Sequence, residues 1–323
     1  MTPEARSHLV KRRAVELGFD RAGITTLDPV PHADALRHWL AEGMAGTMTY
    51  MQRQAGRRLE PHRILPGATR AVVLLKHYTY VDPPRRPGTG RVARYARGRD
   101  YHRALTGPLD DLVHYVISLG GGDVLARHYV DHGPVPEREL AQRAGLGWIG
   151  KNTMLIDPGG GSYTFLATVL TNLDLATDPP FEADRCGSCR LCLDACPTNA
   201  FREERVLDSR RCISYLTIEH RDEIPEERWP LMDHWVFGCD ICQEVCPWNT
   251  RFARETADDL LEYDPQLAAL DLDQLQHISD EEFHRRFGRT ALERAGAQGM
   301  RRNARIAVTN ATRDATCPTP PRP

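Results

Sequence analysis

The chain has 323 residues, of which 41% are hydrophobic and 27% are charged, so its composition is that of a globular protein and excludes a largely disordered one. Its formal net charge of −2 does not by itself indicate a nucleic-acid-binding protein, and such binding would depend on how the charges are distributed. No window approaches the ~18 apolar residues of a membrane-spanning helix.

The N-terminal sequence and the cysteine content indicate where the protein works. Lys11, Arg12 and Arg13 look like the start of a twin-arginine signal, but residues 14–20 do not form the apolar region that export requires. Nine cysteines in a chain of this size point to metal or redox chemistry and not to a framework of disulfides. We therefore expect a cytoplasmic protein.

Residues 1–175 are expected to form one α/β unit. A first helix is predicted from Pro3 to Leu17, because Thr2 is a suitable N-cap and Pro3 fits the first turn. The apolar run at 71–75 predicts a short buried strand. Further helices are predicted at 34–42 and 109–119, further strands at 124–130 and 163–171, and a glycine-rich loop at 145–150.

The rest of the chain divides by composition into three parts. Residues 176–250 hold eight of the nine cysteines and show little strand pattern. Residues 251–310 are predicted to be helical, with a basic helix at 289–310 that ends the segment. The last part, 311–323, is rich in proline and is expected to be disordered.

Two cysteine runs carry the most specific signal. The first has the spacing Cys-x2-Cys-x2-Cys-x3-Cys-Pro, the bacterial ferredoxin pattern in which the fourth cysteine ligates the other cluster. The second run, Cys-x2-Cys-x3-Cys-Pro, lacks one ligand, which Cys212 can supply because it lies between the runs. The predicted ligands are Cys186, Cys189, Cys192 and Cys246 for one [4Fe–4S] cluster, and Cys196, Cys212, Cys239 and Cys242 for the other.

Other interpretations of the cysteines fit less well. Zinc knuckles use separated Cys-x2-Cys pairs, whereas here a run of three closely spaced cysteines precedes x3-Cys-Pro. Cys212 taken alone fits a buried structural cysteine, and Cys317 in the proline-rich tail is a poor ligand candidate. Two clusters in one chain form a short electron wire, so the residues upstream are expected to hold a second redox cofactor or a substrate site.

Four segments of the sequence resemble the epoxyqueuosine reductase family. They are Tyr-Ala-Arg-Gly-Arg-Asp-Tyr-His at 95–102, Tyr-Val-Asp-His-Gly-Pro-Val-Pro-Glu-Arg-Glu at 129–139, Ala-Gly-Leu-Gly-Trp-Ile-Gly-Lys-Asn-Thr at 144–153, and Cys-Asp-Ile-Cys-Gln-Glu-Val-Cys-Pro-Trp-Asn at 239–249. The spacing from Cys196 through Cys212 to Cys239 also fits the family. The resemblance implies an oxidoreductase that removes the epoxide oxygen of epoxyqueuosine at the wobble position of certain tRNAs, giving queuosine.

The resemblance also implies the fold class and the cofactors. It implies an α+β protein with an α/β cobalamin-binding catalytic domain at 1–175, a ferredoxin-like domain with two [4Fe–4S] clusters at 176–250, and a short C-terminal helical segment at 251–310. The cobalamin domain of the family is related to that of reductive dehalogenases. The cobalamin motif Asp-x-His-x-x-Gly is absent here, which agrees with a family that binds the cofactor base-off.

Asp131 aligns with the proposed proton donor of the family. An acid is needed because a carbon–oxygen bond of an epoxide breaks more easily when the departing oxygen receives a proton. The alternative for Asp131 is a turn residue before Gly133-Pro134. The glycines at 145, 147 and 150 either bring backbone amides to the cofactor or only form a tight turn. The residues implied to contact cobalamin are Arg58, Asp131, Lys151, Asn152 and Thr153.

One arginine-rich segment is the candidate for RNA binding. It contains a single acid, Asp100, and two interleaved tyrosines, and such segments suit contacts to phosphates and bases, although a merely solvated charged surface is the alternative. Arg301, Arg302 and Arg305 near the C-terminus could extend the basic surface. The arginines of the segment are Arg85, Arg86, Arg91, Arg94, Arg97, Arg99 and Arg103.

The expected partners are tRNA carrying epoxyqueuosine and an external low-potential electron donor of the ferredoxin or flavodoxin type, with no membrane. Longer members of the family continue into a helical-repeat domain. The RNA-binding surface of this chain is therefore expected to be smaller, or to be completed by something else. Two alternatives stay open: a cytoplasmic reductive dehalogenase that acts on a small organohalide, and a ferredoxin-type electron carrier without a substrate of its own.

Overall fold

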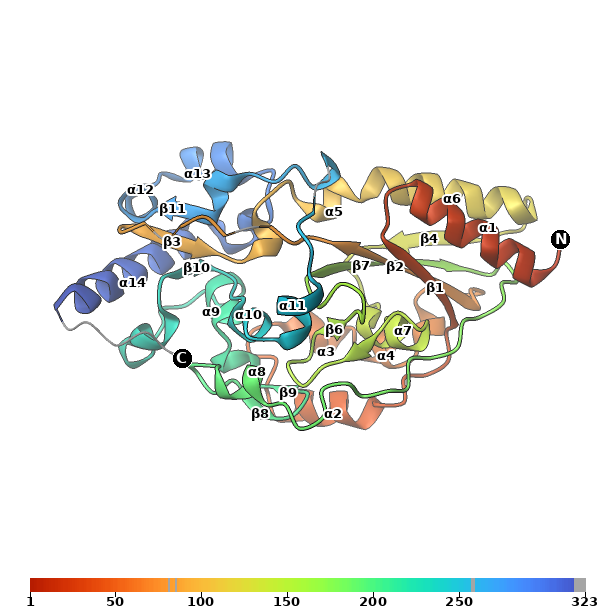
Figure 1. Cartoon of the computed structure of the whole chain (residues 1–323), viewed down its shortest axis with the longest axis horizontal. Helices are drawn as coiled ribbons and strands as arrows, with labels where there is room; N and C mark the ends of the chain where they lie inside the picture. Colours follow the sequence, from red (N-terminus) through yellow and green to blue (C-terminus); the bar gives the residue numbers. More distant parts are fainter. Residues whose placement is uncertain (81, 85, 257–258, 317–323) are drawn as a thin grey trace.

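The structure is a computed structural model that describes residues 1–80, 82–84, 86–256 and 259–316. Arg85 and Cys317, which the sequence analysis singled out, lie outside the described residues. The described elements are arranged around two small β-sheets, with the cysteine-bearing segments beside both (Figure 1). In the described part of the chain, none of the helices has the length and apolar character needed to cross a membrane.

The first sheet has the strand order β1-β2-β7-β4, and each neighbouring pair is antiparallel. Its two long central strands correspond to the predicted strands at 71–75 and 163–171, whereas β1 was not predicted. The strands are β1 (Arg21–Thr26), β2 (Arg70–His77), β7 (Thr164–Thr171) and β4 (Ala126–Tyr129).

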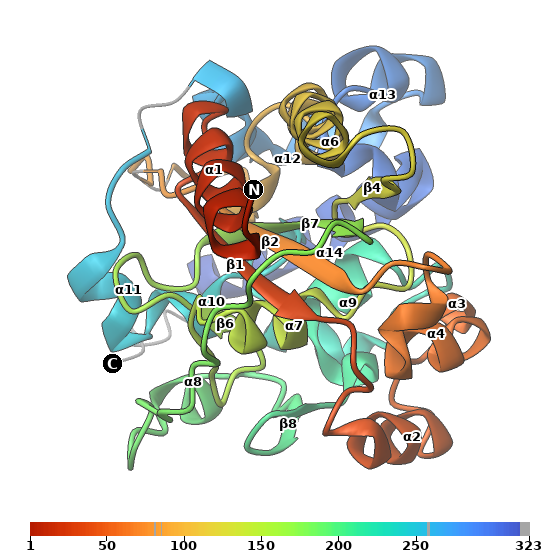
Figure 2. The same ribbon diagram turned by 90° about the vertical axis from the view of Figure 1, so that its right-hand side faces the viewer.

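Both faces of this sheet are covered, which explains why the run at 71–75 is apolar without alternation. Val72 and Leu74 pack against α1 (Pro3–Glu16) and α6 (Thr106–Gly120), while Val73 and Leu75 lie in a second core on the side of α7 (Glu137–Arg143). Figure 2 shows α1 and α6 on one side of the sheet and α7 on the other. The side chain of Thr2 caps α1 by accepting from the backbone N–H of Ala5, as predicted.

The second sheet joins two distant parts of the chain. β3 (Thr89–Val92) pairs in parallel with β10 (Trp235–Phe237) and antiparallel with β11 (Ala269–Asp271). The core on this sheet continues into α12 (Leu272–His277), α13 (Asp280–Phe287) and α14 (Gly296–Thr316). A segment of the first expected domain is therefore built into the core of the C-terminal segment, and the domain boundaries at 175 and 250 stay a prediction.

The last helix of the chain differs in extent from the sequence-based expectation. The basic helix expected at 289–310 begins at Gly296 after a 3₁₀ turn and continues to Thr316, so residues 311–316 are helical and not part of a disordered tail. The apolar positions Met300, Ala304 and Ala307 lie one turn apart on this helix and are fully buried, which ties it to the second core.

Shorter elements complete the chain. The remaining helices are α2 (Ala33–Ala41), α3 (Thr49–Arg53), α4 (Ala55–Leu59), α5 (Tyr101–Ala104), α8 (Leu191–Asp194), α9 (Ile213–Ile218), α10 (Ile241–Glu244) and α11 (Pro247–Phe252). The remaining strands are β5 (Trp148–Ile149), β6 (Leu155–Ile156), β8 (Phe201–Glu203) and β9 (Val206–Leu207), and 3₁₀ turns lie at 61–63, 94–96, 209–211, 226–232, 259–261, 265–268 and 291–295.

Candidate active site and cluster-binding cysteines

Asp131 lies in the loop between β4 and α7 in a constrained conformation. Its φ of +51° is in the left-handed region, which costs a non-glycine residue about 1–3 kcal/mol and persists only where the surroundings fix it. The hydroxyl of Tyr101 donates a hydrogen bond to the Asp131 carboxylate, and the Asp131 backbone N–H donates to Glu137 Oε1 at 3.0 Å. The side chain and the backbone of Asp131 are thus held by separate partners.

Arg58 fixes the same loop from the opposite side. Its Nη2 donates to the carbonyl of Gly133 at 2.9 Å, and its Nη1 donates to the carbonyl of Val135 at 3.4 Å. The Nε of Arg58 is buried and has no hydrogen-bond partner among the described residues. Because a buried polar group normally has a partner, this nitrogen indicates that a further polar group can lie here.

The charges around Asp131 are closely coupled. Burial and, to a lesser extent, the negative charge of Asp131 raise the pKa of Glu137 to about 8. Burial also raises the pKa of the Tyr101 hydroxyl well above its usual range, again with help from the charge of Asp131. A Glu137 carboxyl with such a pKa carries a proton near neutral pH, so the loop holds a protonated acid next to Asp131.

The first predicted set of cysteines surrounds one cavity. The cavity has a volume of about 290 Å³. Burial raises the pKa of Cys192 to about 11, and the nearby thiols of Cys246, Cys186 and Cys189 add to this effect. Trp148 Nε1 donates to the sulfur of Cys186 at 3.4 Å. The cysteines that line the cavity are Cys186, Cys189, Cys192 and Cys246, which is the predicted ligand set.

The cysteines of the second predicted set also lie close to one another. Burial raises the pKa of Cys242 well above its usual range, and the thiols of Cys212, of Cys192 from the first set and of Cys196 contribute. Burial likewise raises the pKa of Cys239, with contributions from Cys242 and Cys212. The backbone N–H of Ala200 donates to the Cys196 sulfur at 3.4 Å. Cys212, which links 3₁₀ turn 209–211 to α9, therefore lies with the three cysteines that lacked a fourth partner.

Aromatic side chains connect the second cysteine set to Asp131. The ring of Tyr95 lies against Gly238, whose φ is +68° and which directly precedes Cys239. Tyr95 and Tyr101 meet edge to face with ring centroids 6.1 Å apart, and Tyr101 in turn donates to Asp131. The cysteines and the candidate acid thus belong to one continuous site.

The structure does not place all the expected cobalamin contacts beside Asp131. Lys151 lines the cavity of the first cysteine set, where its Nζ donates to the carbonyl of Gly187 at 2.6 Å and pairs with Glu204 at 2.8 Å. Asn152 lines the same cavity and donates to the carbonyl of Cys242 at 3.3 Å. The buried charge of Lys151 has an anionic partner, and both residues lie beside the first cysteine set, so their contact with cobalamin stays a prediction.

Thr153 and the glycines of the predicted loop have backbone roles. Thr153 has a φ of +67°, and its carbonyl accepts a hydrogen bond from Arg138, a neighbour of Asp131. Gly147 permits the tight pairing of β5 with β6, since a Cβ there would overlap the carbonyl of Ile156. Of the two roles considered for these glycines, the tight turn is therefore the one that the structure supports at Gly147.

The arginine-rich segment divides into inward and outward side chains. Arg97 is only 2% exposed and pairs with Asp82, as does Arg94, which also bonds Glu244 at 3.2 Å. Arg91 lies over the ring of Trp235 and pairs with Glu244 at 2.7 Å. These three arginines hold the second sheet to its neighbours. Those exposed to solvent are Arg86, Arg99 and Arg103.

The C-terminal arginines are similarly engaged. Arg302 is buried and donates to the carbonyl groups of Leu216 and His220, at 2.6 and 2.8 Å. Arg301 pairs with Asp280 at 2.8 Å, and Arg305 pairs with Glu223 at 2.6 Å. Together with other residues they line a cavity of about 300 Å³, so their first role is to attach α14 to the protein.

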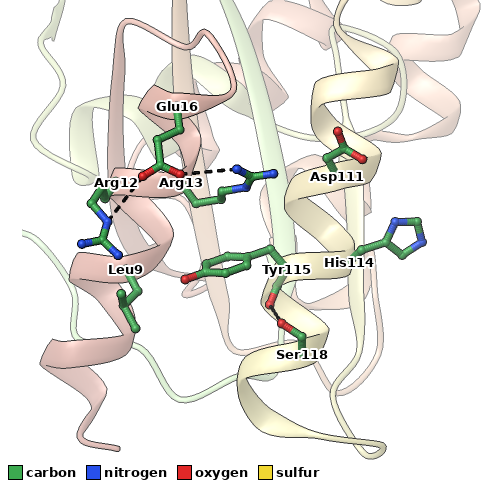
Figure 3. A pocket seen from close by; sticks show the side chains of 8 residues that line it. All are labelled: Leu9, Arg12, Arg13, Glu16, Asp111, His114, Tyr115 and Ser118. Atoms are coloured by element: carbon green, nitrogen blue, oxygen red, sulfur yellow. Dashed lines mark hydrogen bonds and ion pairs between the residues drawn. The ribbon is translucent and has the colours of Figure 1, made fainter.

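A separate surface groove lies between α1 and α6, on the far side of the first sheet from α7 (Figure 3). It has a volume of about 380 Å³, and its lining is mostly polar, with Arg12 and Arg13 paired to Glu16. None of the cysteines or residues around Asp131 lines it. The groove is therefore distinct from the candidate site.

Three side chains of the site had no individual role in the sequence-based prediction. Tyr101 had been grouped with the RNA-binding segment, and Glu137 and Trp148 appeared only as members of motifs. Two of them act through contacts between residues distant in sequence, from Tyr101 to Asp131 and from Trp148 to Cys186. The spacing of six residues from Asp131 to Glu137, across a Gly-Pro turn and at the start of a helix, is the signal that could have revealed the pair.

Comparisons with known proteins identify relatives over nearly the whole chain. Residues 185–249 match the family described as 4Fe-4S double cluster binding domain, and residues 58–132 match the family described as epoxyqueuosine reductase QueG. A protein of Gloeobacter violaceus named epoxyqueuosine reductase is 42% identical over 315 residues, which cover 95% of this chain and 97% of the relative. One of Pseudomonas aeruginosa with the same name is 40% identical over 314 residues, covering 96% of this chain and 86% of the relative.

Solved structures agree with these relatives. An epoxyqueuosine reductase in complex with an epoxyqueuosine-modified tRNA-Tyr stem loop has a TM-score of 0.86 at 31% identity, covering 96% of this chain and 83% of its own. A Bacillus subtilis enzyme whose aspartate catalytic loop is swung out of the active site has the same TM-score, identity and coverage. A variant of the catabolic reductive dehalogenase NpRdhA has a TM-score of 0.50 at 18% identity, covers 98% of this chain and 37% of its own, and shows a shared fold alone.

Proposed function

The chain belongs to the epoxyqueuosine reductase family, and on this premise we propose that it removes the epoxide oxygen of epoxyqueuosine in tRNA and produces queuosine. The observation that carries the proposal is the arrangement around Asp131. A fixed carboxyl group is held by Tyr101 and is connected through Tyr95 to a domain that binds two 4Fe–4S clusters. The site thus combines an acid with a supply of electrons.

The reaction requires both an acid and a supply of electrons. Removal of an epoxide oxygen breaks two carbon–oxygen bonds and forms the second bond of an alkene, and the oxygen leaves as water. The balance needs two electrons and two protons for each epoxide. Iron–sulfur clusters transfer electrons singly, and the acidic groups of the Asp131 loop can supply protons.

We assign the proton donor role to Asp131. Asp131 is an exposed loop residue, but the fold holds its backbone in a left-handed conformation. The orientation of its carboxyl group is therefore set before substrate binds. Glu137, with a pKa of about 8, retains a proton within reach of the same loop and is suited to resupply it. His132 follows Asp131, and His102 stacks on Tyr101 with ring centroids 4.1 Å apart, but their ring nitrogens bond to the Val130 carbonyl and to Asp100, and not to the Asp131 carboxylate, in the described part of the chain.

The residues on the Asp131 side also fit a large polar cofactor. The unpartnered Nε of Arg58 and the carbonyl of Thr153 near Arg138 are the polar groups that would contact cobalamin, in line with the family resemblance. When bound base-off, cobalamin would supply a strongly reducing cobalt centre to the site. Arg58 would contact the cofactor from a fixed position, because both of its Nη atoms donate hydrogen bonds to loop carbonyls.

The cluster ligands follow the two groups of cysteines. We assign Cys186, Cys189, Cys192 and Cys246 to the first [4Fe–4S] cluster, and Cys196, Cys212, Cys239 and Cys242 to the second. The proximity of the thiols within each set supports this assignment. An external low-potential one-electron donor would feed the clusters, since the chain itself has no source of electrons.

For the RNA, the exposed arginines near Asp131 are the candidates. Arg99 and Arg103 flank Asp100 and Tyr101, so phosphate contacts there would bring a modified base toward the acid. Arg86 is exposed as well. Arg99 pairs with Glu262 at 3.3 Å and Arg103 with Asp100 at 3.8 Å, but both side chains remain exposed, whereas Arg91, Arg94 and Arg97 are less exposed and form ion pairs within the protein.

The test is conversion of an epoxyqueuosine-modified tRNA stem loop by the protein loaded anaerobically with iron, sulfide and cobalamin. With a chemical reductant present, mass spectrometry of the nucleosides should show loss of one oxygen atom and appearance of queuosine. The same protein without cobalamin should leave the epoxide intact. If the loaded, reducible protein releases halide from small organohalides but leaves epoxyqueuosine unchanged, the proposed substrate is wrong.

A further inference from the structure

We propose that electrons enter through one particular surface, which docks a small acidic one-electron carrier protein. The surface consists of Arg185, Trp248, Arg251 and Phe252, and we call it the donor face. The inference rests on the proposed function, since it assumes that the cysteines hold clusters, and it adds where and by what kind of partner they are reduced.

The donor face is the outer wall of the first cysteine cavity. Arg185, Trp248, Arg251 and Phe252 line this cavity together with the four cysteines, so a carrier seated on them would lie against the first cluster. The second cysteine set lies on the other side, where Tyr95 and Tyr101 lead to Asp131. Electrons would therefore enter at the first set and leave at the second.

The donor face has the apolar character of a docking site. Phe252 is 37% exposed, although large apolar side chains are usually buried. Trp248 stacks on Phe252 with ring centroids 5.2 Å apart, so the two rings form one platform. A small apolar patch rimmed by charge is typical of weak redox encounters, which bury less than about 1,200 Å².

The charge of the donor face selects the kind of partner. Arg185 and Arg251 are exposed, and neither is within ion-pair distance of a carboxylate in the described part of the chain. Of the two acids next to Arg185 in the sequence, Asp184 pairs with Arg205 at 2.5 Å, whereas Glu182 is exposed and offsets part of the positive charge. A positive rim around apolar side chains attracts an acidic protein and orients it.

RNA is also an anion, but the position of the donor face argues against it as the occupant. A substrate base has to reach Asp131, which lies beyond the second cysteine set. A carrier has to reach a cluster edge and needs no contact with Asp131. Each encounter would transfer one electron, so that the carrier is oxidised by one electron and a cluster is reduced by one, and two encounters would serve each epoxide.

The experiment measures how fast a reduced flavodoxin, a small acidic one-electron carrier, reduces the clusters of the loaded protein in the absence of tRNA. The test variant is Arg185→Glu with Arg251→Glu. The matched control is Arg12→Glu with Arg37→Glu, which changes the net charge equally on α1 and α2, where both arginines are exposed. The second-order rate constant should fall about tenfold or more in the test variant at low salt, and the difference should shrink as salt is added.

Two further measurements make the result decisive. Titanium(III) citrate should reduce the clusters to the same extent in every protein, which shows that the substitutions leave the clusters intact. Phe252→Ser should slow reduction by flavodoxin without changing its salt dependence, because it removes apolar contact and no charge. A charge-reversed protein that is reduced by flavodoxin at the parent rate would overturn the proposal, and so would one that loses only stem-loop binding. Failure of the parent to convert epoxyqueuosine would count against the proposed function alone, because cluster reduction is measured without substrate.

Discussion

Asp131→Asn is the substitution that isolates the acid. Asparagine has nearly the same shape and keeps an oxygen that can accept from the Tyr101 hydroxyl. The backbone bond from residue 131 to Glu137 at 3.0 Å does not involve the side chain and should remain. The loop should therefore keep its conformation, and the change is confined to the loss of a proton donor.

The expected effect is on turnover and not on assembly. Loss of a general acid typically lowers the rate by about 10²–10⁴, which corresponds to about 3–5 kcal/mol in activation free energy. The variant should retain its cobalamin absorbance, its iron content and a reducible cobalt. Single-turnover conversion of the epoxyqueuosine stem loop, measured by mass spectrometry, gives the rate directly.

The matched control is Asp34→Asn, the same chemical change at an exposed aspartate on α2. It should convert substrate at the parent rate. If Asp131→Asn also reaches the parent rate while it holds cobalamin and both clusters, Asp131 is a structural residue and the proton comes from elsewhere, for example from water or Glu137. The reasoning from the geometry of the loop would then be refuted.

Three other variants test other parts of the structure. Cys212→Ala should lower the iron content from about eight to about four atoms per chain, because it removes a ligand of one cubane only, and unchanged iron would contradict the ligand set. Burial alone would lower the pKa of His77, but its hydrogen bonds to Asp157 and Asp20 and the negative charges of these two residues outweigh burial and raise the pKa to about 9. Its ion pairs should therefore stabilise the fold by up to about 3 kcal/mol below about pH 6.5 and lose this effect as pH rises through 9. The difference in unfolding free energy between the parent and His77→Gln should fall accordingly, and a difference independent of pH would disprove the assignment. Arg99→Ala with Arg103→Ala should weaken stem-loop binding and lower the salt slope by about 1–2, whereas an unchanged slope would show that these arginines only face solvent.

The cysteine spacing predicted the cluster region well because ligand spacing is a local property. Short turns bring Cys186, Cys189 and Cys192 to one cavity whatever the rest of the chain does. The assignment of Cys246 to the first set and of Cys212 to the second was also made by counting the ligands that each cluster needs. The acid at Asp131 was found through the family resemblance, and the left-handed backbone that directs it is visible only in the structure.

The arginine-rich segment shows where sequence reasoning is weakest. A run of like charges gives no sign of which side chains meet acids from distant segments. Arg94 is paired with Asp82 and lies near Asp240, and the Arg97 side chain is buried, because β3 is inserted between β10 and β11. That insertion joins residues about 150 positions apart, as in the bond from Arg91 to Glu244, so local patterns could not predict it.

For Lys151 and Asn152 the sequence left the surroundings open for a related reason, and their contact with cobalamin stays a prediction. They follow a glycine-rich run that could equally surround a cofactor or form a turn. The β5–β6 hairpin turns them toward the cysteines, where Lys151 meets Glu204 of a segment some fifty residues away. Only the pairing of the hairpin decides which side of the site these residues serve.

The most direct test of the central claim is the electron stoichiometry of a single turnover. The loaded protein is reduced, freed of excess reductant and mixed anaerobically with the epoxyqueuosine stem loop. We expect the bleached cluster absorbance to return as queuosine forms, with two electrons consumed for each epoxide oxygen removed. Reoxidation of the clusters without queuosine, or formation of queuosine while the clusters stay reduced, would contradict the claim that these cysteines carry the electrons to the site of Asp131.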